Sequence, residues 1–108
     1  MKLTVDSSET IIQRVKRDND FAKALLVAAL SAIVDDEPEI ARIHLRDIVN
    51  GSIGFERLAE VLSKNPKSLH RMLSARGNPS MDNLAAIFRT LFKHFEVDMS
   101  SLLTQRAA

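Results

Sequence analysis

Apolar side chains recur at intervals of three and four residues along almost the whole 108-residue chain, which is the spacing of amphipathic α-helices. Turn signals divide this pattern into separate helices. We expect a first helix that begins at residue 6, followed by helices over residues 20–34, 38–49 and 55–62. A further helix is expected from residue 66 to a stop at residue 77, and the last one from residue 80 to residue 95. The sequence therefore predicts an all-α fold, a small bundle of five or six helices. The alternation of Val97 and Met99 is compatible with one short strand.

Several helix boundaries carry capping signals. Residues 6–9, Asp-Ser-Ser-Glu, resemble a capping box at the start of the first helix. The sharpest boundary is Asn65-Pro66, because an N-cap amide precedes a proline whose φ suits the first helical turn. Gly77 is expected to end that helix, and Ser80 is expected to cap the last one.

The chain contains no internal repeat, low-complexity tract or Ser/Gly-rich linker. We therefore expect a single domain over residues 1–108, with N-terminal helices over residues 1–50 and a flexible tail over residues 104–108. An acid at residue 6 precedes any apolar run, so we expect no secretory signal. The longest apolar stretch, residues 24–34, is about half the length needed to cross a bilayer. A cytoplasmic protein without membrane contact is expected.

Composition excludes several kinds of site. The chain has no cysteine, which rules out disulfides, thiol catalysis and cysteine-based zinc sites. His44, His70 and His94 fall on three separate expected helices without metal-ligand spacing. No pair of active-site carboxylates and no glycine-rich phosphate loop is visible. We expect no metal, no cofactor and no enzymatic activity.

Residues 55–79 contain two short helical patterns separated by about three residues, which is the arrangement of a helix-turn-helix. Ala59 stands where a bulky side chain would hold apart two steeply crossing helices. The apolar side chains expected to lock the pair are Leu58, Leu62, Leu69 and Met72. In such a unit the second helix presents its polar side to a DNA major groove.

Basic charge is concentrated in the same segment, although the whole chain has a net charge of only +1. Residues 55–79 have five Lys and Arg residues against two Glu, so the rest of the chain is net acidic. The candidate DNA-binding residues are Lys64, Asn65, Lys67, Ser68, His70, Arg71, Arg76 and Asn78. An ordinary solvated corner of a helical bundle is the alternative. Ser63 stands where many such turns have glycine, and Lys64 where an apolar residue is common.

A group of short motifs covers this segment and extends upstream. They are Ile53-Gly54-Phe55-Glu56-Arg57-Leu58-Ala59, Pro66-Lys67-Ser68-Leu69, Arg71-Met72-Leu73 and Gly77-Asn78-Pro79, with Glu9-Thr10-Ile11-Ile12 and Leu45-Arg46-Asp47 further upstream. Together they resemble the Cro/repressor-type (XRE-like) regulators known as HigA-like addiction-module antidote proteins. Gly77-Asn78-Pro79 with the preceding Ser74 is the most specific element.

The resemblance implies a lambda-repressor-like bundle whose helix-turn-helix core lies within residues 53–95. It implies a homodimer that binds a palindromic operator in double-stranded DNA and represses its own operon. Residues 66–74 would then be the recognition helix, and residues 77–79 the loop that follows it. Antitoxins of this group also neutralise a RelE/HigB-like ribonuclease toxin.

Two other functions stay open. A prophage-type transcriptional regulator without a toxin shares the same motifs. A helical adaptor that binds a protein through residues 24–34, and does not bind DNA, is the second alternative.

Two features of the N-terminal half suit a protein partner. Residues 1–50 carry seven basic and nine acidic side chains, which suits a basic toxin. The helix over residues 21–34 is apolar nearly all round, so any part that the last helix leaves uncovered would form an interface.

Overall fold

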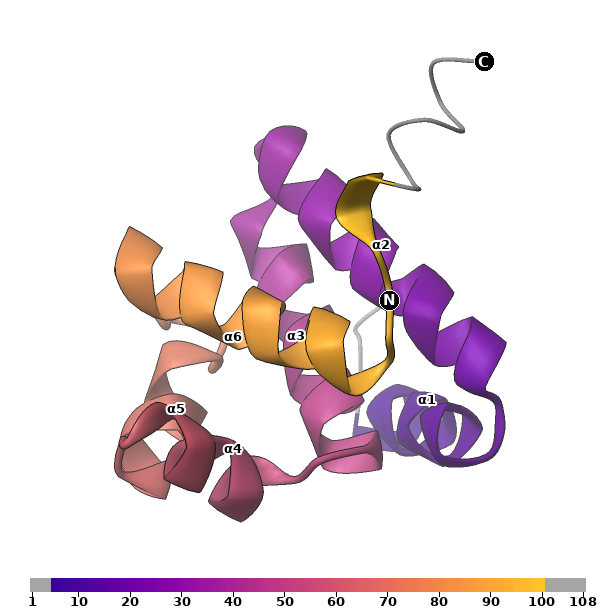
Figure 1. Ribbon diagram of the computed structural model, residues 1–108, viewed down its shortest axis with the longest axis horizontal. Helices are drawn as coiled ribbons and strands as arrows, with labels where there is room; N and C mark the ends of the chain where they lie inside the picture. The colour runs from indigo at the N-terminus through magenta and orange to yellow at the C-terminus, as the bar shows by residue number, and fades with distance from the viewer. Residues whose placement is uncertain (1–4, 101–108) are drawn as a thin grey trace.

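Six α-helices make up the part of the chain that the structure, a computed structural model, describes: residues 5–100. The helices are α1 (Val5–Arg17), α2 (Asn19–Val34), α3 (Pro38–Gly51), α4 (Phe55–Leu62), α5 (Pro66–Met72) and α6 (Met81–His94) (Figure 1). No strand occurs within residues 5–100. The prediction of an all-α fold with five or six helices is confirmed for this part of the chain.

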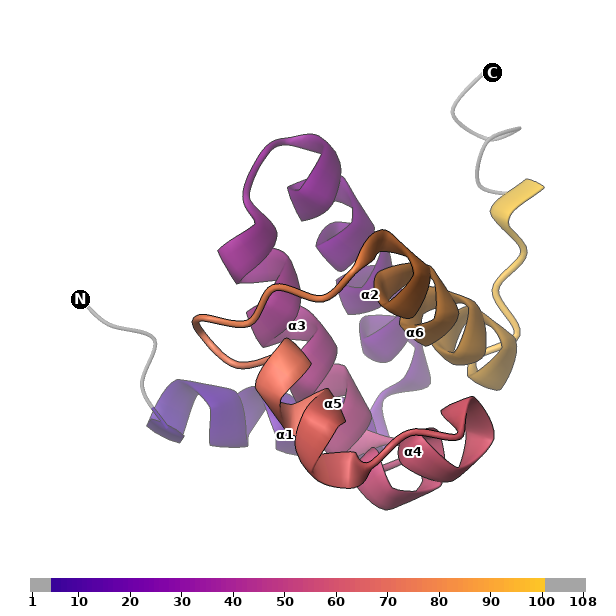
Figure 2. The same ribbon diagram turned by 90° about the vertical axis from the view of Figure 1, so that its left-hand side faces the viewer.

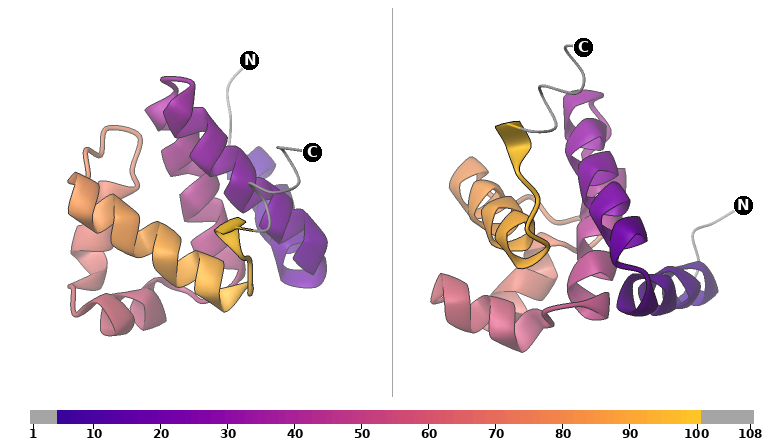
Figure 3. Two further views of the ribbon diagram at one scale, coloured as in Figure 1. Left: turned by 45° about the horizontal axis from the view of Figure 1, so that its top comes forward. Right: turned by 45° about the vertical axis from the view of Figure 1, so that its right-hand side comes forward.

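Helix α3 lies at the centre of the arrangement, where it packs against α1, α2 and α4. Helices α2 and α3 run side by side in opposite directions, and α1 crosses their lower end (Figures 1 and 3). Helix α4 packs on both α5 and α6. The short α4–α5 pair is therefore held from two sides, by α3 and by α6 (Figure 2).

One hydrophobic core joins the helices, and every helix contributes to it. The largest fully buried apolar side chains are Leu26, Leu45, Ile48, Val49, Leu58, Leu69, Leu73, Ile87 and Leu91. Because these residues come from α2 to α6, the N-terminal helices and the α4–α5 pair cannot lose contact without exposing apolar surface. The core thus fixes the position of α5 relative to α3.

The predicted N-caps at the starts of α5 and α6 are confirmed. The Lys67 backbone N–H donates to Asn65 Oδ1 at 2.8 Å, and the Asn83 backbone N–H donates to Ser80 Oγ at 3.1 Å. Both cap residues have extended backbones, as an N-cap requires. These two local signals set where the helices begin.

Two other helix starts differ from the sequence analysis. Asp6 lies inside α1, which already includes Val5, so the expected capping box at residues 6–9 is wrong. Helix α2 begins one residue earlier than expected, because Asp18 is its N-cap and accepts the Phe21 backbone N–H at 3.0 Å.

Helices α2, α4 and α6 end in a left-handed residue that is not glycine. These residues are Asp36, Ser63 and Glu96, with φ of 62°, 54° and 56°. After each of them, the next backbone N–H donates to the carbonyl five residues back, as in a Schellman motif. At the end of α6 this bond joins Val97 N–H to Phe92 O at 2.9 Å. The short strand expected at Val97 and Met99 is therefore wrong, and Met99 is helical.

The end of α5 also differs from the sequence analysis. The helix stops at Met72, five residues before the expected stop at Gly77, and residues 73–76 form a turn. Ser74 Oγ donates to Arg71 O at 2.7 Å, so a side chain occupies a carbonyl that a longer helix would use. Glycine is required at position 77 because the backbone there passes close to the end of α5. A Cβ built on it would lie 2.1 Å from Met72 O, so the chain here passes too close to α5 for any side chain.

Neighbouring helices cover most of the large apolar side chains of α2. The helix packs chiefly against α3 and then α1. Val34 is the one large apolar side chain of α2 that is exposed, with 78% of its surface accessible to solvent. The uncovered apolar part of this helix, on which the sequence analysis made an interface conditional, is therefore small. Nowhere in residues 5–100 is a helix both long and apolar enough to cross a bilayer. The tail predicted over residues 104–108 lies outside the described residues.

Candidate nucleic-acid interface

Helices α4 and α5 pack against each other, and the residues that the sequence singled out lie in or against the hydrophobic core. Ala59 is only 2% exposed, and Leu58 and Leu69 are also buried in the core. Leu62 and Met72 are half-buried and pack against the edge of the same cluster. Because the Ala59 methyl is enclosed, a larger side chain there would have to separate the two helices. All five predicted packing residues are thus in the core or pack against it.

The turn between the two helices explains one departure from the usual pattern. Ser63 has φ 54° and ψ 45°, the left-handed conformation that normally favours glycine. The Lys64 backbone N–H then donates to Ala59 O at 2.8 Å, which ties the turn to the middle of α4. The Lys64 side chain is exposed. Ser63 thus adopts the left-handed conformation that glycine favours, although it is not glycine.

The candidate DNA-binding side chains lie on the outer surface of α5 and its flanking segments. Seven of them are exposed and Ser68 is half-buried; the exposed ones are Lys64, Asn65, Lys67, His70, Arg71, Arg76 and Asn78. Figure 2 shows α5 on the outer side of the bundle, followed by the loop that leads to α6. These side chains are accessible to a large partner, whereas Leu69 on the opposite side of α5 is buried.

Two of these side chains already have structural contacts. Asn65 Oδ1 accepts the Lys67 N–H as the cap of α5, so only the amide NH₂ group of Asn65 remains for an outside acceptor. The His70 ring stacks on Phe55, the first residue of α4, with ring centroids 3.9 Å apart. One face of the imidazole is therefore covered, and the rest of the exposed ring is left for another molecule.

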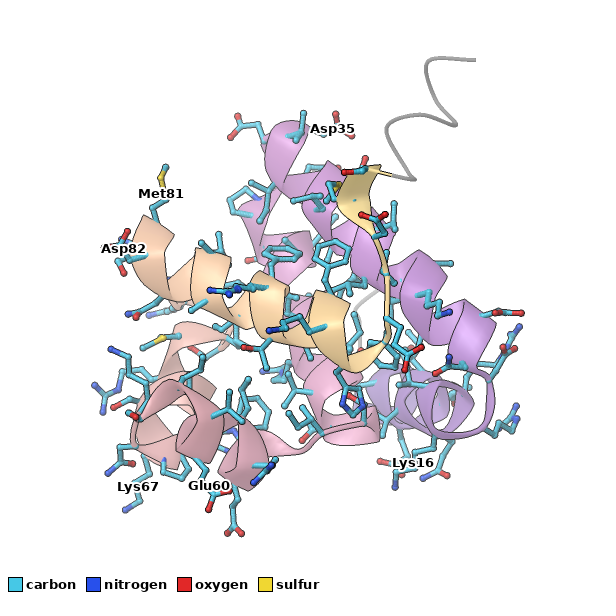
Figure 4. The ribbon with its side chains drawn as sticks, in the orientation of Figure 1. Lys16, Asp35, Glu60, Lys67, Met81 and Asp82 are labelled. Carbon is cyan, nitrogen blue, oxygen red and sulfur yellow. The ribbon has the colours of Figure 1, made fainter. Side chains whose placement is uncertain are left out.

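The charges on this surface are mostly uncompensated. Lys64, Lys67, Arg71 and Arg76 make no ion pair with another described residue. The fifth basic residue of the segment, Arg57, is paired with Glu60 on the same helix. In Figure 4, Lys67 from α5 and Glu60 from α4 both point outward along the lower edge of the molecule. The result is a surface with four free cations around α5.

Sequence reasoning missed one residue that contacts this region. Arg42, in the middle of α3, donates from Nε to Ser74 O at 3.0 Å and from Nη2 to Ala75 O at 2.9 Å. Both carbonyls belong to the turn that follows α5. The contact joins residues more than 30 positions apart in the chain, so no local spacing or capping pattern could have revealed it.

Two titratable groups of α3 are shielded from solvent, Asp47 as a buried residue and His44 as a half-buried one. Asp47 on α3 is 1% exposed; Ser8 Oγ donates to its Oδ2 at 3.4 Å, and its Oδ1 has no hydrogen-bond partner in the structure. Burial raises the pKa of the Asp47 carboxyl and lowers the pKa of His44. Within residues 5–100, no three His, Asp or Glu side chains come together in a way that could hold a metal ion.

Comparison with known proteins gives no relative from which a function could be transferred. No family model, no curated protein and no solved structure matches the chain significantly. The functional argument therefore depends on the residues and geometry described above.

Proposed function

We propose that α4 and α5 form a helix-turn-helix and that the protein binds double-stranded DNA with α5 in the major groove. The observation that carries this proposal is the two-sided character of α5. Its inner side is held in the core through the buried Leu69, while its outer side presents unpaired cations. Major-groove recognition needs both a rigidly held helix and outward donors for phosphates and base edges.

The spacing of the outward residues supports the same function. Lys67 and Arg71 are four residues apart on one helix and so project from the same side. Arg71 suits the two acceptors of a guanine edge, and Lys67 suits a phosphate at the start of the helix. Arg76 and Asn78 follow on the adjoining segment, where they extend the donor surface beyond α5.

We further propose that the protein acts as a homodimeric repressor of its own operon and as an antitoxin for a RelE/HigB-like toxin. A helix of seven residues reads too few base pairs to be selective alone, which favours two copies on an inverted repeat. The antitoxin part rests on the sequence resemblance, and the net acidic N-terminal half suits a basic partner. A prophage-type regulator would repress transcription by binding DNA but would not neutralise a toxin.

Binding to the DNA upstream of its own gene, measured by fluorescence anisotropy over a range of salt concentrations, tests the proposal. We expect specific binding that weakens steeply with salt, because bound cations release counterions from the DNA. Arg71→Ala should weaken binding by about 1 to 3 kcal/mol and relax selectivity if Arg71 reads a base. If Arg71 binds a phosphate, the salt slope should fall by about one unit.

The exposed Arg17 on α1 offers a matched control that removes one positive charge outside this surface. Arg17→Ala should leave selectivity unchanged. Equal binding of all DNA sequences, or no binding at low salt, would contradict the proposal.

A protein-binding module that does not bind DNA is the second candidate. The α4–α6 groove, about 430 Å³ in volume, favours it, because the half-exposed Val61 lies there beside Arg89 and Lys93. Such a module would show no salt-dependent DNA binding. Arg89→Ala would then reduce capture of the protein partner, whereas Arg71→Ala would have no effect.

A further inference from the structure

We propose that Arg42 is a positioning residue of the DNA interface, which holds the segment of residues 73–80 in place for binding. This inference rests on the proposed function and adds a residue from outside the α4–α5 pair. The guanidinium of Arg42 binds two successive carbonyls, Ser74 O and Ala75 O, at 3.0 and 2.9 Å. A planar guanidinium with two donors fixes both the distance and the orientation of the backbone that it binds.

Leu73, the first residue of the segment, is buried in the core, and beyond Leu73 the segment makes no other hydrogen bond to α3 among the described residues. Behind it lies a hollow of about 180 Å³, lined by Ala41, Asn78 and Leu84 among others. Because this space is not filled by side chains, close packing does not hold the part of the segment at Asn78 and Pro79 against α3. The two hydrogen bonds of Arg42 are the specific tie between them.

The Arg42 contact is also connected to the rest of the turn. Ser74 O accepts a second hydrogen bond, from the Gly77 backbone N–H at 3.0 Å. The same carbonyl therefore joins α3 to the point where the chain passes over the end of α5. Arg76 lies between these two anchors and Asn78 directly after them, and both side chains are exposed. Loss of the Arg42 bonds would leave these two side chains without a fixed position.

The test is a double-mutant cycle between Arg42→Met and Arg76→Ala, with binding to the upstream DNA measured against salt. Methionine keeps the apolar stem and removes the donors. We expect Arg42→Met to lower the salt slope by about one unit, as loss of one phosphate contact would do. In that variant, Arg76→Ala should have no further effect, because its contact is already lost. Lys67→Ala, on the capped start of α5, should keep its full effect.

Hydrogen exchange supplies a readout that does not depend on DNA. The Gly77 amide should exchange faster in Arg42→Met, while the Leu45 amide in α3 should keep its protection. Arg42→Lys, which keeps the charge but has a single donor nitrogen, should restore part of the salt slope and part of the Gly77 protection. If Arg42→Met does not fold, the cycle is measured with Arg42→Lys.

The possible failures can be told apart. Additive effects of Arg42→Met and Arg76→Ala, or coupling of equal size to Lys67→Ala, would overturn the positioning role while DNA binding stands. Unchanged exchange at Gly77 would also overturn it. If the unaltered protein binds no DNA, the proposed function fails and the interface role of Arg42 fails with it.

Discussion

The imidazole ring of His70 lies on the phenyl ring of Phe55, with centroids 3.9 Å apart and planes inclined by 20°. Phe55 is buried at the first position of α4, and His70 is on the exposed side of α5. The stack therefore joins the two helices at the start of α4, away from the turn at residues 63–65. His70 has a structural contact that is independent of any DNA contact.

The two contributions of His70 can be separated by two variants. His70→Ala removes the ring and should lower the free energy of unfolding by about 1 kcal/mol, the usual value of an aromatic pair. His70→Phe keeps the ring and removes the nitrogens, so stability should stay near that of the original protein. If the ring nitrogens contact DNA, His70→Phe should lose affinity as His70→Ala does. Equal stability of all three proteins in urea unfolding would show that the stack contributes nothing.

The left-handed turn residue Ser63 predicts a stabilising substitution. Ser63→Gly should raise the free energy of unfolding by about 0.5 to 1 kcal/mol, because glycine adopts φ 54° without the steric cost of a Cβ. Ser68→Gly is the matched control, since Ser68 lies inside α5, where glycine should destabilise by about 0.5 kcal/mol. Thermal unfolding of the two variants should show shifts of opposite sign, and shifts of the same sign would contradict this account of the turn.

The buried carboxyl of Asp47 predicts a pH dependence of stability. Its pKa is raised by burial, so the folded protein holds this proton more tightly than the unfolded chain does. The proton therefore contributes stability at low pH, and this contribution is lost as the pH rises from the unfolded pKa of about 3.9 through the raised folded pKa. At neutral pH the buried charge should lower the stability of the protein.

Comparison with Asp47→Asn isolates this contribution. Asparagine cannot ionise and still accepts from Ser8, so the difference in unfolding free energy between the two proteins should change with pH. The original protein should lose stability relative to Asp47→Asn as the pH rises from about 4 toward 7. Guanidinium unfolding at several pH values measures this difference. A constant difference, or one of opposite slope, would show that Asp47 is not held in its protonated form.

The sequence predicted the parts of the fold that depend on neighbouring residues. Apolar spacing located the helices, and Asn65 and Ser80 marked two starts correctly because each cap acts within three residues along the chain. The predicted end of α5 was wrong by five residues, because the helix ends at Met72 and the stop was placed at Gly77. Gly77 was expected to stop the helix through its local conformation, whereas its role is a close approach of the backbone to Met72.

For the candidate interface too, the sequence predicted only those features that depend on neighbouring residues. Exposure of Lys67 and Arg71 follows from their place opposite the buried Leu69, so helical periodicity was enough to find them. The Arg42 contact joins the middle of α3 to a turn far along the chain. The stack of His70 on Phe55 likewise depends on how two helices meet. Such contacts are set by the core, and no pattern within one helix encodes them.

The close approach of Gly77 to the end of α5 predicts the strongest single effect on this surface. In Gly77→Ala the new methyl would meet Met72 O at 2.1 Å and Arg71 O at 2.5 Å, and both are backbone atoms that cannot turn aside. The turn or the end of α5 must therefore move, and we expect a loss of about 2 to 3 kcal/mol in unfolding free energy. Asn78→Ala, at the exposed neighbouring position, should change stability by less than about 0.5 kcal/mol. Because Gly77→Ala also displaces Arg71 and Arg76, its DNA affinity should fall further than that of Asn78→Ala in conditions where both proteins are folded. Stability equal to that of the original protein would mean that the segment does not pass over α5 at this distance.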